Sequence, residues 1–256
     1  MPPRKKQKTA SESSDSAQDT PKDFPDAALL TSGLKQYPDA ISLRSREHTK
    51  APDELISLDK WILDDLTTKI TSSQPVNKAD MTSLMKWKLS RGKSRPTLLA
   101  LIASNPEALV LRSTTDALKT VRGAKDDLDR ALLALTNACQ MKGVGAATAS
   151  ALLTLQSPHL LPFMSDEAAS FFASTLGQIK YTDAFYKKFA AAMVAEVRRL
   201  NASSESDAEL WDSMKLERAL FTISILKKHG QEHILGSDTN APSVGTSGSL
   251  KRRRDS

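Results

Sequence analysis

The chain has 256 residues, of which 39% are hydrophobic and 26% are charged, a composition that supports one folded core or two small ones. The longest apolar run, residues 98–103, is too short to cross a bilayer, and the chain starts with Pro and Lys residues, so we expect neither a membrane span nor a secretory leader. The net charge is +6, but residues 51–230 carry 23 basic and 20 acidic side chains, so electrostatic binding must come from local clusters.

Residues 1–50 and 236–256 are rich in Ser, Asp, Pro and Gly and poor in branched apolar residues. Such segments bury too little surface to offset the entropy lost on ordering. We therefore predict disordered tails there, on either side of one helical domain at residues 51–235.

Each predicted tail carries a short basic run, Arg4, Lys5, Lys6 and Lys8 near the start and Lys251–Arg254 near the end. Runs of this kind bind the acidic groove of a nuclear import receptor, act as weak nucleic-acid arms, or are simply solvated. Because both flexible ends carry one, we expect an import receptor as partner and a nuclear location.

Between the tails the apolar residues recur with helical spacing, and no segment alternates with period two. The sequence therefore predicts an all-α domain without a sheet. The first helical signals in chain order are a stripe from Leu58 to Ile70 with Ser57 as N-cap, and a helix start at Asn105-Pro106-Glu107 with Asn105 as N-cap. They are followed by stripes from Leu128 to Cys139 and from Phe185 to Leu200, and by a last helix around residues 206–229.

A cluster of cations without any acid lies within ten residues, and Trp87 is among them. A basic stripe beside an aromatic ring can follow a phosphate backbone and stack on an unpaired base. Helical spacing with Leu84 favours a buried Trp87 instead, with the cations exposed. The candidate phosphate contacts in this cluster are Lys86, Lys88, Arg91, Lys93 and Arg95.

A glycine turn joins two helical stripes at residues 141–150. Gly143 and Gly145 permit positive φ and close approach of a foreign backbone, and the N-terminus of the following helix attracts anions. The alternative is that the small residues serve close helix packing. A dinucleotide-binding loop is disfavoured, because Thr148 stands at its third glycine and a helix precedes the turn.

The segment Lys142-Gly143-Val144-Gly145, followed by Thr148-Ala149-Ser150, resembles the hairpin and second helix of the helix-hairpin-helix DNA glycosylase superfamily, including its alkylpurine and endonuclease III branches. The resemblance implies a helix-hairpin-helix element at about residues 126–156. It also implies sequence-independent contacts to duplex DNA. The implied phosphate clamp consists of Lys142, Gly143, Val144, Gly145, Ala146 and Ala147.

The resemblance further implies a catalytic role for Asp166, which follows Gly143 by 23 residues. The alternative is that Asp166 only favours the dipole of a helix from Asp166 to Leu176, with Ser165 as N-cap. Ala147 stands where lyase members of the superfamily carry their Schiff-base lysine, so no β-elimination through that residue is expected. Ala168 stands where many members have a histidine.

Metal and cofactor chemistry find little support in the sequence. Cys139 is the one cysteine, which excludes an internal disulfide and an iron–sulfur signature. Among the four histidines, His229 and His233 have helical i,i+4 spacing, but no carboxylate-rich set accompanies them. We expect no bound metal and no cofactor.

Two classes of function remain open. The first is a nuclear DNA-binding protein resembling base-excision glycosylases, in which Asp166 either retains monofunctional N-glycosylase activity or has lost it. The second is a non-catalytic helical scaffold that inherited the fold and binds another protein. A surface shared by the Gly143 turn, the basic cluster and Asp166 would favour the first class.

Overall fold

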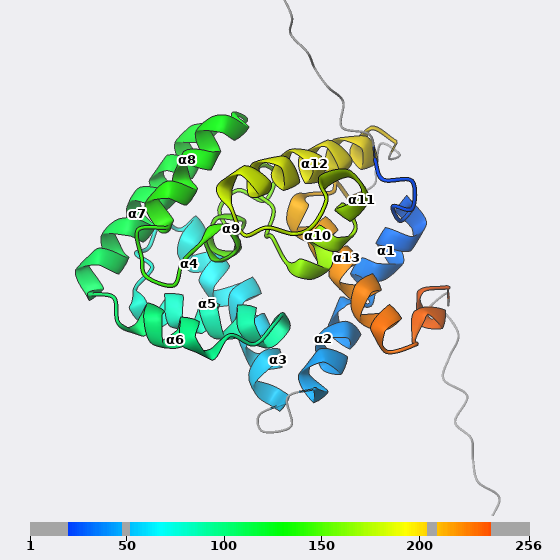
Figure 1. Ribbon diagram of the computed structural model, residues 1–256, viewed down its shortest axis with the longest axis horizontal. Coiled ribbons are helices and arrows are strands. Elements are labelled where there is room, and N and C mark those ends of the chain that lie inside the picture. Colours follow the sequence, from blue (N-terminus) through cyan, green and yellow to red (C-terminus); the bar gives the residue numbers. More distant parts are fainter. Residues whose placement is uncertain (1–19, 48–51, 204–208, 237–256) are drawn as a thin grey trace, which may run out of the picture.

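The computed structural model describes residues 20–47, 52–203 and 209–236, and every regular element in these ranges is helical (Figure 1). The all-α class predicted from periodicity is confirmed. None of the helices described is both long and apolar enough to traverse a lipid bilayer. The basic runs at Arg4–Lys8 and Lys251–Arg254 lie outside the described residues.

The helices follow one another with short connections. In chain order they are α1 (Ala27–Lys35), α2 (Tyr37–Arg46), α3 (Pro52–Trp61), a π-helical turn (Ile62–Leu66), α4 (Thr67–Thr71), α5 (Lys78–Arg91), α6 (Pro96–Ala103), α7 (Glu107–Ala124), α8 (Leu128–Ala138), α9 (Ala146–Leu153), α10 (Asp166–Ser170), α11 (Ala173–Leu176), α12 (Asp183–Ala202), α13 (Ser213–Lys228) and a final 3₁₀ turn (Glu232–Gly236).

The N-terminal boundary of the domain differs from the prediction. Residues 20–47, assigned to a disordered tail, instead contain α1 and α2, which pack against α13 (Figure 1). Leu30, Tyr37 and Ile41 are buried there. These few apolar residues suffice because α13, almost 200 residues away in the sequence, supplies the surface that covers them.

Three predicted helix boundaries are also wrong. Ser57 is not an N-cap, because α3 already begins at Pro52. The last helix begins at Ser213, where the Asp212 side chain accepts a hydrogen bond from the Lys215 N–H. The helix expected from Asp166 to Leu176 is interrupted after Ser170 and resumes as α11.

The helices of greatest functional interest meet near the centre of the molecule (Figure 1). Helix α9 contacts α5, α7, α8 and α12, while α10 rests on α13 and α6 packs against α5. All eight residues of α9 are buried, and four of them are alanines. Their small size lets the surrounding helices approach closely. This packing brings the glycine turn, the basic segment and α10 together.

Candidate functional site

The glycine turn connects α8 to α9, and its two glycines have different surroundings. Gly143 has φ = +82°, and a Cβ there would lie 3.0 Å from the Leu101 Cβ and 3.2 Å from the Leu98 carbonyl oxygen. Gly145 is exposed, and a Cβ there would meet no atom within 4 Å. Close packing therefore explains Gly143, whereas Gly145 leaves the backbone open to an approaching ligand.

Asn105 holds the turn in place. Its Oδ1 accepts a hydrogen bond from the Lys142 N–H at 2.8 Å, and its Nδ2 donates to the Lys142 carbonyl oxygen at 3.0 Å. The expected N-cap role of Asn105 is wrong, since Pro106 occupies the cap position of α7. The Asn105 side chain is 1% exposed and serves the distant hairpin instead.

Helix α9 begins directly after the turn with Gly145 as its N-cap residue, and no side chain caps it. The first N–H groups of a helix lack intrahelical acceptors and carry partial positive charge. Ala146 and Ala147 supply these groups here. Lys142 is exposed on the turn, while Val144 is buried beneath it.

A shallow groove, here called the hairpin groove, runs along the start of α9. Its volume is about 680 Å³, including open solvent. The lining residues come from α5, the segment before α6, α6 itself, the turn, the first residues of α9 and the loop before α12. They are Lys88, Arg95, Leu98, Gly143, Val144, Gly145, Ala146, Ala147, Thr148 and Tyr181.

A second depression, here called the carboxylate pocket, contains Asp166. Its volume is about 400 Å³, including solvent at its mouth. The lining residues combine the end of α5 with the start of α10: Lys88, Arg91, Gly92, Lys93, Arg95, Ala147, Phe163, Met164, Ser165, Asp166, Glu167 and Tyr181.

Four residues line both depressions: Lys88, Arg95, Ala147 and Tyr181. The hairpin groove and the carboxylate pocket are therefore neighbours on one side of α9. Asp166 lies on the same surface as the turn and part of the basic segment, as a DNA interface would require. Ala147 also lines both depressions, and its side chain offers no amine there.

At the start of α10, Asp166 accepts a hydrogen bond from a tyrosine hydroxyl and lies near a lysine ammonium group. The Tyr181 hydroxyl donates to Asp166 Oδ1 at 2.6 Å, and Lys93 Nζ lies 3.7 Å from Oδ2. The Asp166 side chain is 22% exposed, so it remains accessible. Ser165 caps α10 by accepting a hydrogen bond from the Ala168 N–H, which confirms its predicted role.

Tyr181 links Asp166 to the cations. The Arg95 guanidinium lies over the Tyr181 ring, 4.5 Å from its centroid. Partial burial, followed by the hydrogen bond and negative charge of Asp166, raises the pKa of Tyr181 to about 12. The phenol therefore stays protonated and able to donate throughout the physiological pH range.

The five cations of residues 86–95 separate into three environments. Lys88, Lys93 and Arg95 line the carboxylate pocket. Lys86 points to another side of α5, where its Nζ lies 3.6 Å from Glu54 Oε1. Arg91 borders the same pocket from beneath but is 1% exposed, so its expected role as an exposed phosphate contact is wrong. Trp87 is buried, as predicted.

Burial changes the proton affinity of two side chains beside Asp166. The pKa of Lys88 is lowered, first by burial and then by the nearby Arg95 charge. The pKa of Glu167 is raised, mainly by burial. Both shifts disfavour the charged form of the side chain, which is typical of a recessed, partly desolvated surface.

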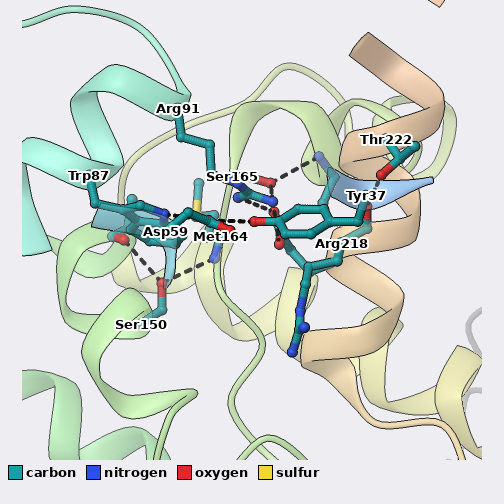
Figure 2. Close-up of polar contacts among 12 residues, drawn as sticks. Tyr37, Asp59, Trp87, Arg91, Ser150, Met164, Ser165, Arg218 and Thr222 are labelled. Atoms are coloured by element: carbon teal, nitrogen blue, oxygen red, sulfur yellow. Dashed lines mark hydrogen bonds and ion pairs between the residues drawn. The ribbon is translucent and has the colours of Figure 1, made fainter. Parts of the chain in front are cut away.

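Arg91 belongs to a polar network beneath the carboxylate pocket (Figure 2). Its guanidinium makes two hydrogen bonds to the Glu217 carboxylate, at 2.7 and 2.8 Å. Ser165 also donates to Glu217, through a 2.5 Å bond. The Phe221 ring covers the guanidinium at 3.8 Å. This network ties the start of α10 to α5 and α13, and so fixes the position of the neighbouring Asp166.

A second part of the network centres on Asp59, which Tyr37 and Trp87 approach in Figure 2. The Tyr37 hydroxyl and the Trp87 indole N–H both donate to Asp59 Oδ1, at 2.7 and 2.8 Å. These bonds satisfy the polar atoms of two buried aromatic side chains. They anchor Trp87 in the core beside Phe163, 5.2 Å away between ring centroids.

Sequence reasoning missed several residues that shape this surface. Nothing in the sequence separates Tyr181 from Tyr186, yet Tyr181 is 41% exposed in the groove and Tyr186 is wholly buried. The acid Glu217 lies on the buried face of α13, and its position beside Leu216 and Leu220 in the sequence indicates that burial. The Asn105-Pro106 pair, by contrast, wrongly indicates Asn105 as the N-cap of α7.

In the residues that the structure describes, no three His, Cys, Asp or Glu side chains gather into a potential metal site. Comparison with known proteins adds no relative. No protein-family model, curated protein or solved structure matches this chain.

Proposed function

We propose that the protein binds duplex DNA through sequence-independent contacts to the phosphate backbone. The observation that carries this proposal is the shared lining of the hairpin groove and the carboxylate pocket by Lys88, Arg95, Ala147 and Tyr181. A backbone that follows the hairpin groove meets cations and an unblocked helix N-terminus before it reaches Asp166.

Gly145 is the point of closest approach for a phosphate in this proposal. It is exposed, it has no side chain, and it precedes the N–H groups of Ala146 and Ala147. A phosphate placed there receives backbone hydrogen bonds and the positive end of the α9 dipole. Arg95 and Lys88 add charge from the lining of the hairpin groove. None of these contacts reads a base, so binding is independent of sequence.

We further propose that Asp166 supports monofunctional excision of a base that has been turned out of the duplex. Its support is the accessible carboxylate in a recessed pocket, together with the absence of an amine at Ala147. The bond between the base and sugar C1′ breaks, and the carboxylate stabilises the positive charge that develops on the sugar. Water then adds at C1′ and loses its proton to the carboxylate, which passes it to the base that departed with the bonding electron pair.

Nuclear location forms part of the same proposal. The basic runs at Arg4–Lys8 and Lys251–Arg254 would bind an import receptor. A fluorescent fusion tests this directly. We expect nuclear accumulation of the full chain and loss of it when the cations of both runs are changed to Ser. Nuclear exclusion of the unaltered chain would contradict this part of the proposal.

The decisive test measures binding to an undamaged duplex and to one with an abasic-site analogue across a salt series. Gly145→Asp is compared with Gly145→Asn, since both side chains fit the open position and both are good N-caps. The two variants differ mainly in charge. We expect Gly145→Asp to lose binding far more than Gly145→Asn, because its carboxylate occupies and repels the phosphate position.

The cations provide a second matched pair on one helix. Lys88→Gln should weaken binding and reduce the slope of log K against log salt by about one. Lys86→Gln should change neither, because Lys86 faces Glu54 rather than the hairpin groove. Equal effects of the two variants would mean that DNA does not occupy this groove.

Base release is tested only once binding is established, with Asp166→Asn as the matched inactive variant. Release from a damaged duplex by the native chain, but not by Asp166→Asn, supports excision. If neither duplex binds at low salt, the DNA proposal fails and the non-catalytic scaffold, which binds another protein, takes its place.

A further inference from the structure

Tyr181 occupies the junction between the two depressions and contacts a charged side chain from each. Its hydroxyl donates to Asp166 Oδ1 at 2.6 Å, and its ring lies under the Arg95 guanidinium at 4.5 Å. Arg95 also lines the hairpin groove, where the proposed phosphate sits. A chain of direct contacts thus runs from the groove to the carboxylate.

The geometry of these contacts allows Arg95 to hold two partners at once. A guanidinium that stacks on an aromatic ring uses its face, and its N–H groups point outward in the plane. Arg95 also interacts with the Tyr181 hydroxyl by hydrogen bonding, but a guanidinium has five N–H donors, so others remain available to phosphate oxygens. Binding of a phosphate would therefore restrain Arg95 without removing it from Tyr181.

We propose that Tyr181 is a positioning residue that couples phosphate binding at Arg95 to the orientation of Asp166. This inference rests on the proposed function and adds a regulatory contact to the same site. In the free protein the Tyr181 hydroxyl already bonds to Asp166, while the Arg95 side chain that lies over the Tyr181 ring is exposed at the surface. Bound DNA fixes Arg95, the fixed guanidinium restrains the Tyr181 ring, and the ring holds Asp166 for reaction.

The composition of the chain makes the coupling directly observable. The chain has three tyrosines, and Tyr37 and Tyr186 are 6% and 0% exposed whereas Tyr181 is 41% exposed. Incorporation of 3-fluorotyrosine gives three ¹⁹F resonances, and Tyr181→Phe assigns the one of interest. Tyr37 and Tyr186 act as internal controls, because both are buried away from the groove.

The first experiment titrates the fluorinated full-length protein with a short undamaged duplex and follows binding in parallel by fluorescence anisotropy. We expect the Tyr181 resonance to shift in proportion to the bound fraction, while the other two stay in place. Arg95→Lys keeps the positive charge but loses the planar group, so it should still bind DNA while the Tyr181 shift disappears. Asp166→Asn should move the Tyr181 resonance of the free protein.

The second experiment separates binding from reaction in Tyr181→Phe, which keeps the ring and removes the hydroxyl. We expect its Kd for the duplex to change by a much smaller factor than its rate, because the ring that contacts Arg95 remains. Its single-turnover rate of base release should fall by about 100-fold, the loss typical of a misplaced reacting group. A purely structural role for Tyr181 would change binding and rate together.

The outcomes distinguish the two proposals. Absence of binding in the anisotropy titration overturns the proposed function and this inference with it. Clear binding with an unmoved Tyr181 resonance overturns the inference alone. Binding with an equal Tyr181 shift in Arg95→Lys also overturns it, because the relay through the guanidinium would then be unnecessary.

Discussion

Asn105 and Lys142 are joined by a reciprocal pair of hydrogen bonds, one from the Lys142 N–H and one to its carbonyl oxygen. The pair spans 37 residues of sequence and links the end of α6 to the turn between α8 and α9. Asn105 is buried, so water cannot easily replace either bond. The shape of the proposed phosphate clamp thus depends on a residue outside it.

Asn105→Ala should destabilise the protein by about 1–3 kcal/mol, because it removes the hydrogen bonds that a buried side chain makes to the backbone of α6 and of Lys142. It should also weaken DNA binding, since the turn loses its support. Urea denaturation and anisotropy measure the two effects. Asn137→Ala serves as the control and should leave binding intact. Asn137 lies on α8, is more exposed than Asn105, and donates a hydrogen bond to Thr120 of α7. Unchanged stability of Asn105→Ala would contradict the buried pairing.

Alanine should destabilise the protein to different extents at the two glycines of the turn. Gly143→Ala places a Cβ 3.0 Å from Leu101 in a left-handed conformation, which costs about 1–2 kcal/mol for the backbone alone. Gly145→Ala meets no atom within 4 Å, so it should cost less, about 0.5–1 kcal/mol from placing alanine at the N-cap of α9. Thermal denaturation of both variants provides the check, and equal melting temperatures would contradict it.

The buried Arg91–Glu217 pair should be far more sensitive to change than a surface pair. Glu217→Gln leaves the Arg91 charge without its carboxylate and should cost about 3–5 kcal/mol. Replacing both residues, as in Arg91→Met with Glu217→Leu, should recover much of this loss. Lys187→Met removes an exposed ion pair with Asp129 and should have little effect. The free energies of unfolding in urea decide between these expectations.

Cys139 should react slowly with thiol reagents in the folded protein. Burial, with a smaller contribution from the charge of Asp183, raises its pKa to about 11 from a reference of 9.0. The neutral thiol is thus favoured by folding, so its stabilising effect is complete below pH 9 and is lost as the pH rises toward 11. Reaction rates measured from pH 7 upward, with and without urea, test this. Equal rates in the folded and unfolded protein would contradict it.

Local features of the candidate site were readable from the sequence. Ser165 caps α10 because a serine hydroxyl can reach the N–H groups of its own helix, a contact that needs no distant partner. The turn at Gly143 was likewise visible, because two apolar stripes with helical spacing flank it. Periodicity also placed Trp87 in the core. These properties depend on residues within a few positions of one another.

The sequence by itself determined the helical class, the glycine turn and the acidic start of α10, since backbone hydrogen bonding and helical periodicity act over one or two turns. The tertiary structure alone decided that Arg91 is buried against Glu217, that α1 and α2 fold onto α13, and that Tyr181 reaches Asp166. Each of these outcomes depends on a surface supplied from far along the chain. Burial and long-range pairing follow from which helices cover one another, and residue type or spacing does not specify that.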